Sequence, residues 1–188
     1  MLLTVSGVAA DVNIQKLLTA VRVEEWLQED LFRFKWWFLL GLSSFLIFVW
    51  QKLIDKKRLP EIMLYAVLTT ILTMGIVEYG EELTLWDYPN DISPIFPVLT
   101  AINLSILPML YSLVYQYFQT WKSFVPAVII ATCLLSFVVE PALSWGKLYQ
   151  LLKWKYYYSF PIYIAIALII RWVVIKLFAI ASKAKNKI

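Results

Sequence analysis

Residues 36–50 read WWFLLGLSSFLIFVW, an apolar run with tryptophan at both ends. A helix needs about 20 residues to cross the hydrocarbon core of a bilayer. Tryptophan is enriched at the two membrane–water interfaces, where its indole ring meets both apolar and polar surroundings. The run therefore predicts a membrane-spanning helix over residues 36–53, anchored by Trp36, Trp37 and Trp50.

Further apolar runs predict four more spans, at residues 60–79, 95–117, 124–144 and 159–178. The composition agrees, because 61% of the 188 residues are hydrophobic and 16% are charged, whereas soluble domains are about 45–50% apolar and about 25% charged. The predicted fold class is therefore all-α, an integral membrane bundle of five transmembrane helices preceded by an N-terminal amphipathic helix. Residues 1–35 form the predicted N-terminal tail, and residues 36–188 form the transmembrane domain.

The amphipathic helix is predicted from the stretch VRVEEWLQEDLFRF at residues 21–34. Its apolar side chains, among them Val23, Trp26 and Leu27, recur near the helical period, and polar side chains occupy the other faces. The polar side is mainly acidic, which disfavours attraction to anionic lipids. We expect this helix to pack on its own bundle or on a partner.

The orientation in the membrane is predicted from basic residues in the short connection after the first span: Lys52, Lys56, Lys57 and Arg58. Such density is typical of cytoplasmic loops. With five crossings, the N-terminus lies outside and the C-terminus lies inside. The net charge of +4 is then a signal of orientation, and because the bases form no stripe with a readout motif, no nucleic-acid partner is expected.

The composition also limits the chemistry. The chain has no histidine, and Cys133 is its one cysteine. Histidine is the most frequent metal ligand and the usual general base, and one thiol supports neither a disulfide framework nor a thiolate metal site. The sequence therefore predicts no metal site and no cofactor, and any catalysis would depend on carboxylates, Tyr, Ser or Lys.

Two glutamates are candidates for such chemistry. Glu78 is about 27 Å along a helix that starts at Pro60, and Glu140 is about 24 Å along a helix that starts at Phe124, so both approach the outer boundary. Close carboxylates could share a proton, bind a cation or act as an acid–base pair. The alternative is that both are hydrated or hydrogen-bonded at the interface.

An outer-face binding region is predicted around GIVEYGEELTLWDYPNDISPIFP, residues 75–97, which carries five carboxylates. Stiffened by prolines, it would form an acidic and aromatic lip on the outer face. The later loop GKLYQLLKWKYYYSFPIY, residues 146–163, brings lysines to the same side. The candidate residues for binding a lipid headgroup or a peptide are Trp86, Asp87, Tyr88, Trp154 and Tyr158.

Two further polar residues lie within predicted spans. Asn103 precedes Pro108, where proline frees a backbone carbonyl, so Asn103 either repairs the backbone or belongs to a functional broken helix. Arg171 lies about 18 Å along the last span. An intramembrane cation is a functional candidate, but snorkelling toward the inner headgroups explains it equally well.

Six motifs, taken in their order along the chain, resemble those of a protein family. They are EEWLQEDLFRFKWWFLL (24–40), KLIDKKRLPEI (52–62), LWDYP (85–89), LPMLYSLVYQYFQTWKSF (107–124), FVVEP (137–141) and WKYYYSFPIYI (154–164). Together they resemble an uncharacterised family of small multi-pass membrane proteins of spore-forming bacilli and clostridia. The resemblance implies the bacterial cytoplasmic membrane and a link to spores, but it assigns no catalytic residue.

Three hypotheses for function follow. The first is a multi-pass membrane protein of non-enzymatic binding or structural function, whose outer lip contacts lipid, a small ligand or a protein. The second is a small transporter or channel subunit that uses Glu78, Glu140, Asn103 and Arg171. The third is a membrane-embedded enzyme acting on lipid headgroups through paired glutamates. The bilayer itself is an expected partner in all three.

Overall fold

The computed structural model describes residues 10–90, 92–93 and 105–185, and most of these are helical. The α-helices are α1 (Ala10–Glu25), α2 (Phe34–Leu53), α3 (Leu59–Glu82), α4 (Leu107–Tyr117), α5 (Trp121–Leu134), α6 (Glu140–Trp145) and α7 (Tyr156–Lys185). Two π-helical turns, η1 (Trp26–Asp30) and η4 (Leu135–Val139), and a 3₁₀ turn, η2 (Lys56–Arg58), connect them. Strands β1 (Trp86–Asp87) and β2 (Gln150–Leu151) pair antiparallel.

Four helical segments of this described part are long and apolar enough to cross a membrane: 34–53, 56–82, 121–145 and 156–184. They correspond to the first, second, fourth and fifth predicted spans. The third predicted span, 95–117, is described only from residue 105, and its helix α4 has 11 residues, too few to cross alone. A fifth crossing therefore stays a prediction.

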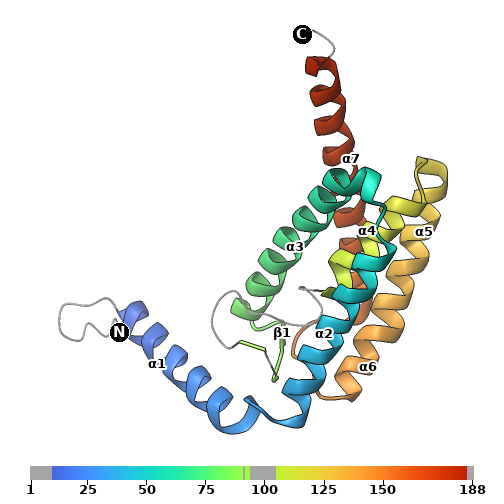
Figure 1. Ribbon diagram of the computed structural model, residues 1–188. Coiled ribbons are helices and arrows are strands. Elements are labelled where there is room, and N and C mark those ends of the chain that lie inside the picture. Colours follow the sequence, from blue (N-terminus) through green and yellow to red (C-terminus); the bar gives the residue numbers. More distant parts are fainter. Residues whose placement is uncertain (1–9, 91, 94–104, 186–188) are drawn as a thin grey trace.

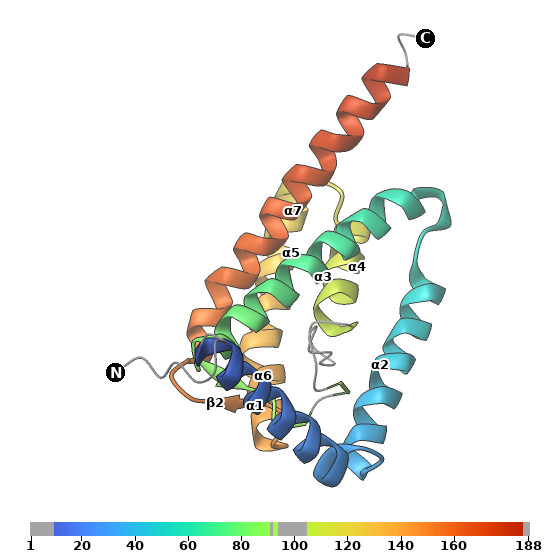
Figure 2. The same cartoon turned by 90° about the vertical axis from the view of Figure 1, so that its left-hand side faces the viewer.

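The helices run up and down between two ends of the molecule (Figures 1 and 2). One end, which we call the Arg58 end, holds η2 and the α4–α5 connection at residues 118–120. The other, which we call the Trp86 end, holds β1, β2 and the start of α2. Helix α3 packs mainly on α4 and α7, and α5 packs on α7 and α4. The start of α2 and the last turns of α7 lie at opposite ends (Figure 2).

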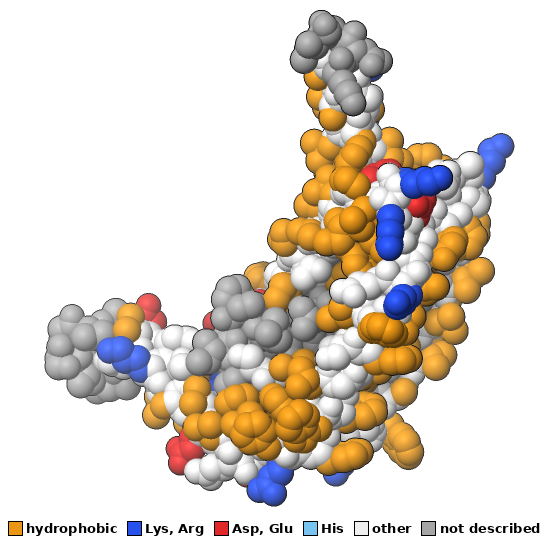
Figure 3. Space-filling view, in the orientation of Figure 1, with side chains coloured by type: hydrophobic (Ala, Val, Ile, Leu, Met, Phe, Trp, Pro, Cys, Tyr) orange, Lys and Arg blue, Asp and Glu red, His pale blue; other side chains and the backbone are white. Residues whose placement is uncertain are grey.

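The flanks of the bundle are hydrophobic. Exposed side chains on α2 include Trp37, Phe38, Phe45 and Phe48. On the face shown in Figure 3, hydrophobic side chains are spread over the flank, and most of the Lys and Arg side chains in view lie toward the two ends. Apolar flanks with charged ends are typical of a helical bundle that contacts lipid around its circumference.

The core is built mainly from α3, α4, α5 and α7. Tyr65 of α3 stacks on Tyr115 of α4 with ring centroids 4.5 Å apart, and its hydroxyl donates to the carbonyl of Ala167, 3.1 Å away. On α5, Phe124 and Val128 are fully buried in the same cluster. The centre of the bundle is therefore a packed aromatic and aliphatic interior.

The stretch predicted as one amphipathic helix, residues 21–34, is divided between the end of α1, η1 and the first residue of α2. Helix α1 buries none of its residues and projects from the Trp86 end (Figure 1). The backbone turns sharply between η1 and α2 at Phe32, which has a φ of 61°, a left-handed conformation that residues other than glycine adopt infrequently. Within α1 and η1 no described residue is buried against the bundle, and the alternative, packing on a partner, stays a prediction.

A π turn interrupts the segment that carries Glu140. Pro141 lacks a backbone N–H, so the carbonyl of Phe137 loses its usual helical donor, and the chain forms η4 just before α6. A π turn inserts an extra residue and so rotates the side chains that follow it around the helix axis. Glu140, the first residue of α6, faces the interior and is only 3% exposed.

Candidate functional site

The polar site at the Trp86 end begins with a pair of short strands. Trp86 pairs with Leu151, and Asp87 pairs with Gln150. The carbonyl oxygen of Leu85 accepts hydrogen bonds from three successive backbone N–H groups, those of residues 152, 153 and 154, at 2.9–3.1 Å. This backbone arrangement holds the chain after α3 against the chain before α7.

The strand pairing places Trp86 in the interior. Its indole ring packs edge-on against Trp154, with centroids 4.9 Å apart, and Tyr88 packs against Tyr149 at 5.1 Å. Trp86 is 7% exposed and Tyr88 is 9% exposed. These two candidates therefore differ from the expected outer lip: they line the inside of the bundle end, whereas Asp87 and Tyr158 are exposed.

Glu140 lies near this aromatic group and accepts hydrogen bonds from two residues of α7. The hydroxyl of Tyr163 donates to its Oε1 at 2.7 Å, and the hydroxyl of Ser159 donates to its Oε2 at 3.1 Å. Ser159 in turn accepts the indole N–H of Trp154 at 3.0 Å. Glu140 is thus the acceptor at the end of a buried hydrogen-bonded chain from α7.

An open cleft of about 840 Å³ lies beside this network. One wall comes from η1 and the start of α2, and the other comes from the segments around β1 and β2. Its lining carries both signs of charge: the acidic residues are Glu29 and Asp30, and the basic residues are Arg33, Lys35 and Lys147. This volume lies within the range of typical ligand pockets, about 300–1,000 Å³.

One hydrogen bond joins the two walls of the cleft, and two more lie within the walls. The ammonium group of Lys35 donates to the carbonyl of Lys147 at 3.3 Å, and the side-chain amide of Asn90 donates to the same oxygen at 3.1 Å. The guanidinium group of Arg33 donates to the carbonyl of Gln28 at 3.3 Å. These bonds to neutral carbonyls hold the cationic groups in place without neutralising their charge.

The pKa values of two groups that line the cleft are shifted by their surroundings. Partial burial raises the pKa of Asp30; Lys35 opposes this shift, and the nearby Glu29 and Glu25 add to it. Burial raises the pKa of Tyr149 as well, and the carboxylate of Glu140 adds to that shift. Tyr149 lines both the cleft and the interior cavity beside Ser159 and Tyr163, so its side chain lies between the cleft and the Glu140 network.

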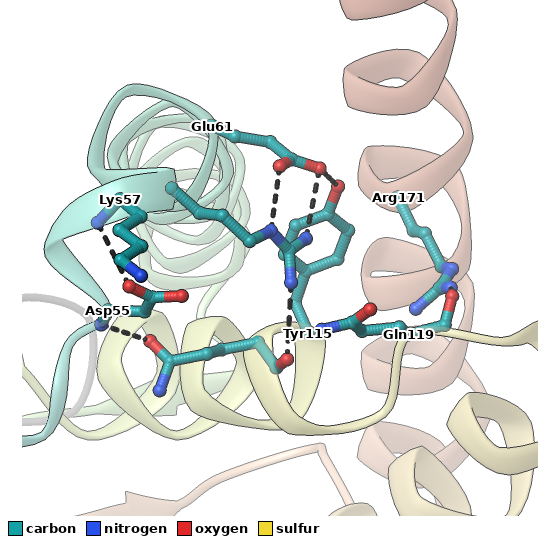
Figure 4. A network of polar contacts seen from close by, with 8 residues as sticks. Asp55, Lys57, Glu61, Tyr115, Gln119 and Arg171 are labelled. Atoms are coloured by element: carbon teal, nitrogen blue, oxygen red, sulfur yellow. Dashed lines mark hydrogen bonds and ion pairs between the residues drawn. The ribbon is translucent and has the colours of Figure 1, made fainter.

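A second polar network lies at the Arg58 end (Figure 4). Arg58 donates to both carboxylate oxygens of Glu61, at 3.0 and 3.1 Å, and the hydroxyl of Tyr115 donates to the same carboxylate. Gln116 accepts the backbone N–H of Asp55 at 2.8 Å and donates to the carbonyl of Leu53 at 3.0 Å. Arg58–Glu61 is the one ion pair within the described residues.

Arg171 belongs to this end and is 2% exposed. It donates to the carbonyl of Phe118 at 2.8 Å and to the carbonyl of Gln119. Its guanidinium carbon lies 4.2 Å from the ring centroid of Phe124 and 5.0 Å from that of Trp121. Arg171 therefore holds the α4–α5 connection through backbone carbonyls and aromatic faces.

The structure brings some of the predicted polar residues together and leaves others apart. Among the described residues, the hydrogen bonds of Glu140 come from α7, and none joins it to Glu78. Glu78 lies one helical turn before Glu81 on α3 and is half-buried. Arg171 takes part in the network at the Arg58 end. Asn103 lies outside the described residues.

Several residues of the site were not singled out from the sequence. Ser159 and Tyr163 were missed as partners of Glu140, although their spacing of four residues places them on one face of a helix. Glu61 was missed because an acidic residue in the first turn of a helix is ordinary. The cleft residues Lys35 and Asp30 were assigned to a tail, because only the turn at residues 31–33 brings them beside β2.

No group of three or more His, Cys, Asp or Glu side chains that could hold a metal occurs within residues 10–90, 92–93 and 105–185. No family model, no curated protein and no solved structure matches the chain. The geometry and charges of the site are therefore what indicate a function.

Proposed function

We propose that this protein is a non-enzymatic integral membrane protein that binds the headgroup of a zwitterionic phospholipid in the cleft at the Trp86 end. The observation that carries the proposal is the cleft itself, which has a volume of about 840 Å³ and is lined by both carboxylates and cationic side chains. It lies at one end of a bundle with apolar flanks. A ligand with one anionic and one cationic group matches this lining.

The basic side of the cleft suits a phosphate group. Arg33 and Lys35 each use one hydrogen bond on a backbone carbonyl, and their other N–H donors remain for a ligand. A planar guanidinium group binds phosphate oxygens in pairs, and an ammonium group adds a compact charge. Lys147 contributes a third cation on the opposite wall.

The acidic side of the cleft suits an ammonium group. Glu29 and Asp30 lie side by side on η1, and their mutual repulsion and partial burial raise the pKa of Asp30. A bound cation would relieve both effects, because an opposite charge within about 4–6 Å favours the ionised carboxylate. The two signs of charge in one cleft thus recognise phosphate and ammonium together.

The acyl chains of such a ligand have an apolar surface beside the cleft. Phe34 lines the cleft and is largely exposed, and Trp37 and Phe38 on α2 are exposed as well. Phe34 stacks on Phe38, one turn further along α2, with ring centroids 6.4 Å apart. A phospholipid with its headgroup in the cleft would lay its chains along this aromatic face of α2.

The membrane orientation is part of the same proposal. The basic residues around η2 at the Arg58 end favour the cytoplasmic side, which places the cleft and the start of α2 outside and the C-terminus inside. The bacterial cytoplasmic membrane and the link to spores are supported by the motif resemblance alone.

The interior supports binding over transport. Along α7, the buried residues between the partners of Glu140 and Arg171 include the apolar side chains of Ile166, Ala167 and Ile170. Both charged groups are held by hydrogen bonds at opposite ends of the molecule. This apolar stretch of α7 favours binding over transport, because a path for an ion or solute through the membrane needs polar side chains along it.

Native mass spectrometry of the purified protein with defined lipids tests the proposal. We expect phosphatidylethanolamine to be retained more strongly than phosphatidylglycerol, which lacks the ammonium group. The double variant Glu29→Gln/Asp30→Asn should abolish this preference, because it removes the acidic side of the cleft. Glu82→Gln, at an exposed position at the end of α3, is the matched control and should keep the preference. Equal retention of the two lipids by the unmodified protein would contradict the proposal.

A further inference from the structure

A buried donor at the Trp86 end has no partner among the described residues. Trp86 is 7% exposed, and its indole N–H forms no hydrogen bond with any residue that the structure describes. Leaving a buried donor unsatisfied costs about 1–3 kcal/mol. By contrast, the indole N–H of the neighbouring Trp154 donates to Ser159 at 3.0 Å. The unpaired N–H of Trp86 is therefore a specific feature that needs an acceptor.

A small internal cavity adjoins this tryptophan. Its volume is about 30 Å³, and Trp86, Thr73, Tyr149 and Ser159 are among its lining residues. One water molecule needs about 10–15 Å³ of such space and two to four polar partners. The cavity is large enough for one or two water molecules and too small for a lipid headgroup.

We propose that an ordered water molecule occupies this cavity and accepts the indole N–H of Trp86. Its own hydrogens are donated to hydroxyl oxygens on the cavity wall. Ser159 accepts one hydrogen bond from Trp154 and donates one to Glu140, so one of its two lone pairs remains. Thr73 donates to the backbone carbonyls of Thr69 and Thr70, so its oxygen can accept as well.

The water molecule extends the hydrogen-bonded network of Glu140. Through Ser159, the water connects Trp86, which follows α3, with Glu140 on α6. Tyr149, which is 4% exposed, lines the cavity on one side and the cleft on the other. The buried carboxyl group of Glu140 is then joined by hydrogen bonds to a site that one tyrosine ring separates from the cleft. This inference is independent of which ligand the cleft binds.

Nuclear magnetic resonance of the full-length protein in lipid nanodiscs tests the water site. With ¹⁵N-labelled tryptophan, Trp86→Phe identifies the indole signal of residue 86 by its loss. We expect a dipolar cross-peak between this indole proton and water, with the sign in a rotating-frame experiment that distinguishes contact from chemical exchange. Absence of a dipolar cross-peak at Trp86 would overturn the proposal.

A cavity-filling variant locates the water. Val77 lines the cavity, and Val77→Ile adds one methylene group there. The cross-peak at Trp86 should be lost in this variant, while the indole signal of Trp154 keeps its position because its bond to Ser159 is direct. Retention of the Trp86 cross-peak in folded Val77→Ile would show that the water lies elsewhere and would contradict the assignment to this cavity.

Discussion

The indole ring of Trp86 lies directly against Gly80, so closely that a Cβ atom at residue 80 would overlap the Cζ2, Cη2 and Cε2 atoms of the ring. A side chain at residue 80 would occupy the volume of the indole ring, and this explains the glycine at that position. We expect Gly80→Ala to displace Trp86 and to lower the free energy of unfolding by about 1–3 kcal/mol, as overpacking of a core does. Equilibrium unfolding in mixed detergent, followed by tryptophan fluorescence, measures this change.

Gly75 on the same helix is the matched control, because a Cβ atom there would meet nothing within 4 Å. Gly75→Ala should change the stability by no more than about 1 kcal/mol, the scale of the helix propensity difference. Equal effects of the two alanine substitutions would contradict the close packing of Trp86 on Gly80.

Glu140 should matter for stability through its acceptor oxygens. Glu140→Ala leaves the hydroxyl groups of Ser159 and Tyr163 without their acceptor in the interior, and we expect a loss of about 2–4 kcal/mol in the free energy of unfolding. In Glu140→Gln, the amide oxygen accepts one hydroxyl and the amide nitrogen donates to the other, so the loss should be clearly smaller. A glutamine variant as unstable as the alanine variant would contradict this role.

Arg171 should act as an anchor of the α4–α5 connection. In Arg171→Lys the charge remains, but the planar group that bonds two successive carbonyls and stacks on Phe124 is lost. We expect chymotrypsin to cleave at Phe118 about tenfold faster, which corresponds to about 1.4 kcal/mol for local opening. Lys176→Gln, an exposed position on α7, is the control. Unchanged cleavage in Arg171→Lys would count against the anchor.

The orientation can be tested by cysteine labelling. In a background where Cys133 is replaced by serine, Lys155→Cys reports on the Trp86 end and Lys57→Cys reports on the Arg58 end; both positions are exposed. We expect a membrane-impermeant maleimide to label residue 155 on intact cells and residue 57 only after permeabilisation. The reverse pattern would place the cleft on the cytoplasmic side.

The helices were largely predictable from hydrophobic length. The run from Trp36 to Trp50 gave the first span to within two residues, since α2 begins at Phe34. The later helices extend past their apolar runs: α3 continues to Glu82 and α7 to Lys185. Hydropathy marks the part of a helix in contact with lipid, whereas the backbone continues until a turn or a cap ends it.

The site was less predictable, because it depends on contacts between distant segments. Glu140 was recognised as a candidate, but its partners on α7 follow from the packing of that helix beside α5 and η4. From its sequence context, Trp86 was predicted to be an exposed interface residue. Only the pairing of β1 with β2 and the space over Gly80 place its side chain in the interior. The cleft depends on the turn at Phe32, which no sequence pattern indicated.

The most direct test of the account is photo-crosslinking of the protein in its membrane with phosphatidylethanolamine that carries a photoreactive headgroup, followed by peptide mapping. Headgroup binding in the cleft predicts crosslinks in residues 29–35 and 144–151, the two walls of the cleft, and their loss in Glu29→Gln/Asp30→Asn. Crosslinks spread evenly around the flanks of the bundle, or unchanged in that variant, would contradict headgroup binding in the cleft.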